Sequence, residues 1–181
     1  MAAMEAVATA PAVLKRQVFS MTDIMSSAKR SALMSRIRAT DTTPERYIRV
    51  LLEAASLEFD QHARDLPGRP DFVFREQQTA VFIDGDFWHG WRFPLWRHRL
   101  SDKWREKISK NRERDVRNHR TLRRRGWTVV RIWEHQVEAN PLGCIERIAL
   151  ALEWKSFDAA AVETAYAALP PLKRRNRLPK P

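Results

Sequence analysis

The sequence has almost no cysteine and no long apolar run, and each absence excludes a class of protein. Cys144 is the only cysteine in 181 residues, which excludes an intramolecular disulfide framework and a metal site built from several cysteines. No run approaches the roughly 18 apolar residues that a membrane-spanning helix needs. Acidic residues are the minority, 22 against 33 basic ones, and the net charge is +11. This charge predicts a polyanionic partner, although basicity alone does not separate nucleic acid from an anionic membrane.

The two ends of the chain have the composition of appendages to one folded domain. Residues 1–22 are Ala-rich and their cations come last, the reverse of a secretory signal, so we expect a flexible lead-in and a cytoplasmic protein. Residues 155–181 form a basic tail that prolines break, although the Ala-rich run 158–169 can add a turn or two of helix. Those prolines disfavour an amphipathic membrane helix. Residues 23–154 are the predicted domain.

The hydrophobic patterning of this domain predicts an α/β fold with a central mixed four-stranded sheet flanked by helices. Thr43 is the expected cap of one helix, because Pro44 suits a first helical turn. A strand after a long helix must join the sheet by a crossover, which places that helix on one sheet face. Residues 85–100 have no clear period and are expected to form a loop. The predicted helices cover residues 26–39, 44–55, 101–125 and 141–154, and the predicted strands cover residues 57–62, 71–75, 79–84 and 127–133.

Two aspartates stand at the ends of neighbouring predicted strands. Asp71 begins one strand and Asp84 ends the next. If these strands pair as an antiparallel hairpin around residues 76–78, both carboxylates meet at one sheet edge, where oxygen ligands suit Mg²⁺. For either aspartate taken alone, ordinary turn chemistry is the simpler interpretation.

Two helical acids fall on faces that should be buried. Asp115 lies in the stripe with Trp104, Ile108 and Leu122, and Glu45 lies on the inward side of its helix. A buried carboxylate needs a metal or a cation as partner. Ion pairing of Asp115 with Arg112 or Arg117 is the structural alternative, but four acids able to converge favour a functional site.

The stretch after Asp84 holds aromatic side chains and a histidine. Phe87 and Trp88 lie where a surface loop is expected, so they either stack on nucleic-acid bases or plug the core beneath the loop. His89 is titratable near neutral pH and could take a proton from water that attacks a phosphate. The patterns give no role to the other histidines, His62, His98, His119 and His135.

Several motifs stand in collinear order at residues 34–38, 40–42, 44–45, 66–72, 81–89, 104–108, 111–115 and 126–134. Together they resemble the very-short-patch repair (Vsr) endonucleases, a branch of the PD-(D/E)xK nuclease superfamily. The resemblance covers about residues 23 to 152 and implies a restriction-endonuclease-like three-layer α/β fold. It also implies a Mg²⁺-dependent enzyme that nicks one DNA strand beside the thymine of a T·G mismatch.

The resemblance also implies roles for single residues. The family's metal-binding aspartate falls on Asp71, the residue whose carbonyl helps to hold the metal falls on Ile83, and Asp84 matches an acid common in the family. The water-activating histidine falls on His89, and the supporting acids fall on Glu45 and Asp115. The aromatic wedge falls on Phe87 and Trp88, and a methionine that enters from the other groove falls on Met34. The cations expected to bind DNA phosphates are Arg36, Arg38, Arg69, Lys107 and Lys110.

This chain departs from the family at the cysteines that usually hold a structural zinc. Asp86, Trp91 and His135 stand at those positions, so we expect no zinc and expect Trp91, Phe93 and Trp96 to pack there. A site rebuilt from Asp86, His89, His98 and His135 is the less favoured alternative.

The departure leaves the DNA target open. A T·G mismatch endonuclease is the first hypothesis, with double-stranded DNA as partner, a monomeric state, a nucleoid location and mismatch-repair proteins as further expected partners. A nickase or defence nuclease acting on modified or distorted DNA is the alternative. A DNA-binding protein without catalysis is disfavoured, because all the mapped acids are present.

Overall fold

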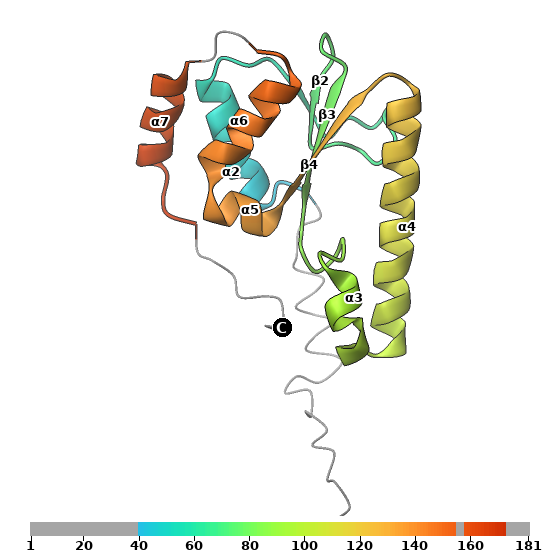
Figure 1. Cartoon of the computed structure of the whole chain (residues 1–181). Helices are drawn as coiled ribbons and strands as arrows, with labels where there is room; N and C mark the ends of the chain where they lie inside the picture. Colours follow the sequence, from blue (N-terminus) through green and yellow to red (C-terminus); the bar gives the residue numbers. More distant parts are fainter. Residues whose placement is uncertain (1–39, 155–157, 173–181) are drawn as a thin grey trace, which may run out of the picture. The chain divides into compact units, whose positions relative to one another are not determined.

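A computed structural model describes residues 40–154 and 158–172 of the chain (Figure 1). The predicted helix over residues 26–39 lies outside these residues. No helix in the described ranges is long and apolar enough to cross a membrane. The elements in chain order are α2 (Thr43–Ala54), β1 (Asp60–Gln61), β2 (Phe72–Phe74), β3 (Thr79–Asp84), α3 (Phe93–Trp96), the 3₁₀ helix η1 (Arg97–Arg99), α4 (Asp102–Arg124), β4 (Thr128–Trp133), α5 (Glu134–Ala139), α6 (Pro141–Ala151) and α7 (Ala159–Ala168).

The four strands form one mixed sheet in the order β1-β2-β3-β4. The β2–β3 hairpin is antiparallel and pairs Phe72 with Val81, whereas β3 and β4 are parallel and pair Ile83 with Ile132. A parallel neighbour requires a crossover, and α4 supplies it. The prediction of a mixed four-stranded sheet with α4 on one face is confirmed.

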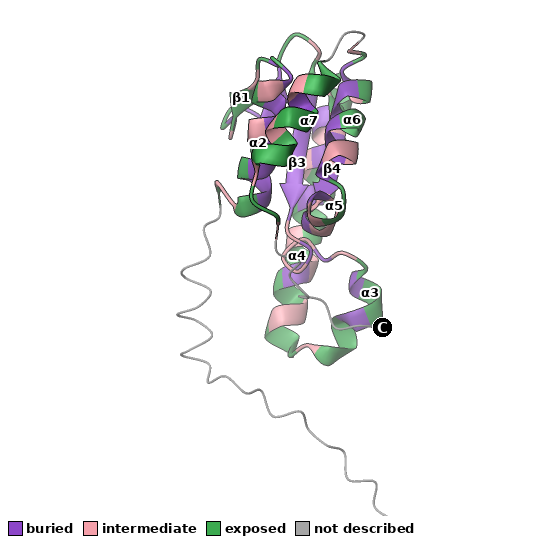
Figure 2. Cartoon of the chain, turned by 90° about the vertical axis from the view of Figure 1, so that its left-hand side faces the viewer, coloured by how far each residue is buried: buried purple, intermediate pink, exposed green. Residues whose placement is uncertain are grey.

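Helices cover both faces of the sheet, which gives three layers. Figure 1 shows α4 on one side of the strands and α2, α5, α6 and α7 on the other. Alternate residues of the hairpin point to opposite faces, as the two-residue period of a strand requires. Phe72 and Val81 point to one face and belong to the larger core with Ile48 and Ile145. The hairpin residues that point to the opposite face pack toward Leu122 of α4. Strand β3 is buried along its whole length, and Figure 2 shows the buried colour running along it.

Local details differ from the sequence-based expectations. The N-cap of α2 is Thr42 rather than Thr43, because the Thr42 hydroxyl accepts from the Glu45 N–H and donates to the Glu45 carboxylate. Residues 85–100 are not wholly a loop: they contain α3 and η1, since Phe93 and Trp96 are buried together against Ile108 of α4. The short helix α5 between β4 and α6 was not predicted.

Helix α7 lies in the segment that the sequence analysis assigned to a basic tail. Its Val162 is buried in the larger core, and α7 packs against α2. The Tyr47 hydroxyl donates to the Pro170 carbonyl oxygen at 3.1 Å. The folded part of the chain therefore continues past residue 154. A helix that is mostly alanine and buries a single valine gives little periodic signal, which is why patterning indicated only a turn or two.

Candidate active site

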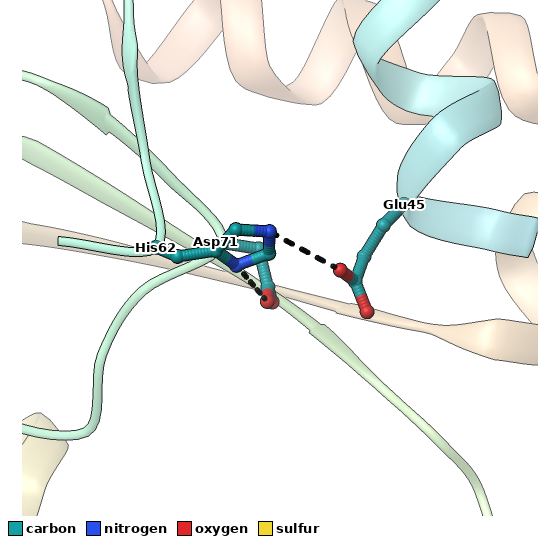
Figure 3. Close-up of side chains that lie close together, drawn as sticks. All are labelled: Glu45, His62 and Asp71. Atoms are coloured by element: carbon teal, nitrogen blue, oxygen red, sulfur yellow. Dashed lines mark ion pairs between the residues drawn. The ribbon is translucent and has the colours of Figure 1, made fainter. Parts of the chain in front are cut away.

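Three polar side chains from separate segments meet beside the start of β2, and we call Glu45, His62 and Asp71 the Glu45 cluster (Figure 3). His62 Nε2 lies 3.9 Å from Glu45 Oε2, and His62 Nδ1 lies 3.8 Å from Asp71 Oδ1. One potential ligand atom from each residue lies within 4.8 Å of the other two. Within residues 40–154 and 158–172, this is the one group of three such side chains spaced to hold a metal ion.

Backbone contacts fix each member of the Glu45 cluster. The Asp71 N–H donates to the Val81 carbonyl at 2.9 Å, and the Ile83 N–H donates to Asp71 Oδ2 at 2.6 Å, so the aspartate extends the hairpin. The Glu45 carboxylate accepts from the Asp41 N–H and the Thr42 hydroxyl, both at 2.7 Å, at the start of α2. The His62 N–H donates to the Asp71 carbonyl at 3.2 Å. The cluster is therefore held in place by elements of the fold itself.

The electrostatics of the Glu45 cluster favour an added cation. Burial raises the pKa of Asp71 well above its ordinary value, and the charges of Glu45 and Asp84 raise it further, although the Ile83 N–H works in the other direction. Arg46 and Arg49, on the same helix as Glu45, form ion pairs with Asp41 at 3.9 and 3.8 Å, and Arg49 also forms one with Glu53 at 3.9 Å. The cluster thus gathers two carboxylates and one imidazole, an arrangement whose negative charge a metal ion would offset.

A second group of titratable side chains lies at the end of β3, and we call Asp84, His89, Asp115 and Arg131 the His89 cluster. His89 Nδ1 lies 2.6 Å from Asp115 Oδ2 and 3.2 Å from Asp84 Oδ1. The Arg131 guanidinium pairs with the Asp84 carboxylate through Nε, and its Nη2 lies 3.5 Å from Asp115 Oδ2. Two carboxylates here face one guanidinium and one imidazole, so Arg131 offsets part of the negative charge of the carboxylates.

The pKa of Asp115 is shifted in the opposite direction to that of Asp71. Burial raises the pKa of Asp115, but the hydrogen bond and charge of His89 together with Arg114 outweigh burial and lower it below its ordinary value. Arg114 Nη2 lies 3.2 Å from Asp115 Oδ1. The Asp115 carboxylate therefore holds the His89 ring through Nδ1.

The structure divides the predicted acids between the two clusters. Glu45 and Asp115 are buried on the inward faces of their helices, as expected, with 5% and 6% exposure. Asp84 is near enough to affect the pKa of Asp71, but its carboxylate contacts His89 and Arg131. The cation on Asp115 from its own helix is Arg114 rather than Arg112 or Arg117.

Sequence reasoning missed two members of these clusters. His62 was given no role, although it directly follows the strand that pairs with the one beginning after Asp71. Arg131 was not singled out, although it is the only charged residue of the apolar strand β4. This isolated charge in an apolar strand was the signal by which Arg131 could have been found.

The aromatic residues of the loop after β3 are neither fully exposed nor fully buried. Phe87 stacks on Trp96 with ring centroids 5.6 Å apart, and both Phe87 and Trp88 contact Trp104 of α4. The Lys107 ammonium lies over the Trp88 ring, 5.1 Å from its centroid. These rings pack on α3 and α4, as the core alternative predicts in part, and they keep accessible surface; stacking on bases stays a prediction.

The predicted DNA-binding cations that the structure describes are exposed. Arg69 and Lys107 reach the surface, and Lys110 is exposed while pairing with Glu106 at 2.6 Å. The remaining predicted DNA-binding residues, Met34, Arg36 and Arg38, lie outside the described residues.

The positions of the family's zinc cysteines hold a polar and aromatic contact. His135 Nδ1 lies 2.7 Å from Asp86 Oδ1, and the Trp91 ring packs against His135 and Trp133 with centroids 4.7 and 4.9 Å away. His89 points instead to Asp84 and Asp115, and the four residues of the alternative site do not gather. Trp91 packs where expected, whereas Phe93 and Trp96 pack against Ile108.

The described residues thus form a restriction-endonuclease-like α/β fold with two clusters of titratable side chains at one edge of its sheet.

Residues 22–94 match the family model described as DNA mismatch endonuclease Vsr. The chain is 40% identical over 129 residues to the type II nicking enzyme V.XorIIP of Xanthomonas oryzae pv. oryzae, covering 70% of this chain and 93% of that protein. It is 36% identical over 130 residues to the type II nicking enzyme V.NmeAIP of Neisseria meningitidis, covering 71% and 92%. It is 39% identical over 116 residues to the DNA mismatch endonuclease Vsr of Escherichia coli K12, covering 63% and 74%. The chain belongs to the Vsr family.

Proposed function

We propose that this protein is a DNA endonuclease that nicks one strand of a duplex by Mg²⁺-dependent hydrolysis of a phosphodiester bond. The observation that carries the proposal is the pair of clusters at one sheet edge, one with excess negative charge and one that orients an imidazole. The names of the relatives, nicking enzymes and a mismatch endonuclease, support the same reaction class.

The donor set of the Glu45 cluster fits a divalent cation. Asp71 and Glu45 would hold Mg²⁺, and the Ile83 carbonyl remains a proposed further ligand because the Ile83 backbone adjoins Asp71. When bound, Mg²⁺ supplies positive charge that stabilises the phosphate as negative charge develops on it. Asp71 is fixed by the hairpin before metal or DNA arrives, which limits the reorganisation that the reaction requires.

The His89 cluster supplies the proton acceptor. His89 would take a proton on Nε2 from the water that attacks phosphorus, on the side opposite the departing sugar oxygen. Asp115 stabilises the imidazolium that forms, because it contacts Nδ1 at 2.6 Å. Arg131 offsets the charge of Asp84 and Asp115, so these carboxylates hold His89 rather than compete for the metal.

The exposed cations and the half-buried rings would bind and open the duplex. Arg69, Lys107 and Lys110 would contact phosphates, and their contribution should weaken steeply with salt. Phe87 and Trp88 would insert between base pairs, and Met34 would enter from the other groove. Arg36 and Arg38 would contact phosphates. A mismatch lowers the cost of this unstacking.

The proposed substrate is a T·G mismatch, and the experiment is a nicking assay with Mg²⁺. Matched duplexes carry T·G, a normal pair or 5-methylcytosine at one position. Preferential nicking beside the mismatched thymine is expected. Equal or greater cleavage of paired or methylated DNA would instead favour a nickase of modified DNA, which the Asp86–His135 contact at the cysteine positions makes the second candidate. Binding without cleavage of any duplex would favour a non-catalytic protein.

We also propose that the protein acts as a cytoplasmic monomer alongside mismatch-repair proteins.

A further inference from the structure

We propose that His62 is a nitrogen ligand of the cation held by Glu45 and Asp71, and that the site consequently prefers Mn²⁺ to Mg²⁺ and binds Zn²⁺ as a competitor. This inference rests on the proposed function for the presence of a metal site. It goes further by assigning a third protein ligand and the chemical class of metal that this ligand selects.

The His62 ring lies between the two carboxylates (Figure 3). Its Nε2 faces Glu45 Oε2 at 3.9 Å and its Nδ1 faces Asp71 Oδ1 at 3.8 Å. Both distances exceed the hydrogen-bond limit of about 3.5 Å, so each carboxylate is within ion-pair distance of the ring without a hydrogen bond to it. One ligand atom from each of the three residues lies within 4.8 Å of the other two, a spacing that can hold a shared ion.

The backbone directs His62 to this position. The residue has a φ of +51°, in the left-handed region that side chains other than glycine adopt infrequently. Its N–H is held by the Asp71 carbonyl at 3.2 Å, so the turn is tied to the residue whose carboxylate it faces. The turn therefore fixes where the imidazole lies relative to Asp71.

The site is accessible to a small ion from the side of α2. The His62 side chain is 33% exposed, while the Glu45 side chain is 7% exposed. A small recess beside them is lined by Glu45, Arg49, His62 and Phe72, among others. A cation entering here would meet the His62 imidazole and the Glu45 carboxylate first. The Asp71 side chain, which faces the other ring nitrogen, is 18% exposed.

Ligand chemistry gives the metal preference. Mg²⁺ is bound chiefly through oxygen atoms and keeps several waters, so an imidazole adds little to its binding. Imidazole nitrogen is a good ligand for Zn²⁺, which binds nitrogen and carboxylate oxygen together. Mn²⁺ also suits carboxylate oxygen, but as a transition-metal ion it accepts an imidazole more readily than Mg²⁺ does. A site of two carboxylates and one imidazole therefore binds Mn²⁺ more tightly than a purely oxygen site does.

Mn²⁺ binding to the full chain tests the assignment. We compare the unmodified protein, His62→Gln and, as a matched control, His98→Gln, whose histidine is exposed in η1. Calorimetry gives the affinities for Mn²⁺ and Mg²⁺, and pulsed EPR of bound Mn²⁺ detects a directly bound imidazole nitrogen. We expect His62→Gln to lose that nitrogen signal and about tenfold or more in Mn²⁺ affinity, with Mg²⁺ affinity changed less than about threefold. The His98→Gln control should match the unmodified protein.

The outcomes separate this inference from the proposed function. A nitrogen signal that survives in His62→Gln, or no nitrogen signal in the unmodified protein, would overturn the role of His62 whatever the nicking activity. Nicking that fails in every metal while the signal depends on His62 would overturn the endonuclease proposal alone. Should His62→Gln fail to fold, selective broadening by Mn²⁺ of one imidazole in the unmodified protein, assigned by ¹⁵N-histidine spectra, replaces it. Broadening of His89 or His98 instead of His62 would refute the assignment.

Discussion

The Glu45 cluster and the His89 cluster contain the same residue types and differ in their charge balance. Each has two carboxylates and one histidine, but Arg131 reaches only the His89 cluster. The pKa of Asp71 is raised, chiefly by burial, whereas the pKa of Asp115 is lowered because His89 and Arg114 outweigh burial. Across the two clusters, six acids and histidines differ in the cations that contact them: Arg114 and Arg131 contact carboxylates of the His89 cluster, whereas a metal ion is proposed for the Glu45 cluster.

Replacing Asp71 by Asn should have the largest effect on nicking. The change removes a charged ligand from the Glu45 cluster, and we expect a loss of about 10³-fold or more in the Mg²⁺-dependent rate, with DNA affinity retained. Single-turnover nicking and gel-shift titration measure the two properties. Asp65→Asn is the control, because Asp65 is exposed and pairs with Arg75. Full activity of Asp71→Asn would remove Asp71 from the mechanism.

Replacing His89 by Gln should slow nicking by about 10²- to 10⁴-fold while leaving metal affinity nearly unchanged, because the proton acceptor lies in the other cluster. Nicking rates and Mn²⁺ calorimetry on the same preparation check this separation. A parallel loss of metal affinity would mean that the two clusters form one site, and the comparison would fail.

Replacing Arg131 by Met should make the His89 cluster resemble the Glu45 cluster. The variant removes the guanidinium partner of Asp84 and leaves Asp115 with Arg114 alone, and we expect a loss of about 2 kcal/mol in the free energy of unfolding, since the Arg131 side chain is only 26% exposed. The variant should also bind a second Mn²⁺ ion weakly. Denaturant unfolding and metal stoichiometry measure both effects. Unchanged stability and a single bound ion would show that Arg131 does not set the charge balance.

The two clusters should give opposite, smaller pH dependences of stability in the metal-free protein. The raised pKa of Asp71 means that the folded state keeps a proton that the unfolded state releases, so its contribution falls as pH rises above the ordinary value of 3.8 toward the raised value. The lowered pKa of Asp115 gives a stabilising contribution that is present above 3.8 and is lost as pH falls through the lowered value.

Urea unfolding between pH 3 and 8 measures these contributions as differences from the Asp71→Asn and Asp115→Asn variants. The difference should decrease with pH for Asp71 and increase with pH for Asp115. Added Mn²⁺ should flatten the Asp71 difference. Slopes of the same sign for both residues would contradict the assigned electrostatics.

Much of the fold could be predicted from the sequence because its signals are local. The apolar run of β3, the hairpin beside it and the long helix before β4 together define a mixed sheet with a crossover. The positions of helices α3 and α7 could not be predicted, because each helix is held by tertiary packing: Trp96 of α3 packs on Ile108, and Val162 of α7 packs on the larger core. Local patterning does not report such tertiary contacts.

Only part of the candidate site could be predicted, because only some of its residues give a signal within their own segment. Asp71 ends a turn before a strand, and Glu45 and Asp115 interrupt apolar helix faces, so each is visible in its own segment. His62 and Arg131 become members only through pairing between segments: β1 has two residues, and Arg131 meets Asp84 because β4 runs parallel to β3. The division into two clusters therefore could not be derived from sequence patterns.

Divalent-metal binding to Asp71→Asn and Asp84→Asn tests the central claim most directly. Both aspartates flank the same hairpin, but Asp71 belongs to the Glu45 cluster and Asp84 is paired with Arg131 and His89. By calorimetry with Mn²⁺, we expect Asp71→Asn to abolish binding and Asp84→Asn to change the affinity by less than about threefold. Loss of binding in Asp84→Asn with binding retained in Asp71→Asn would contradict the account.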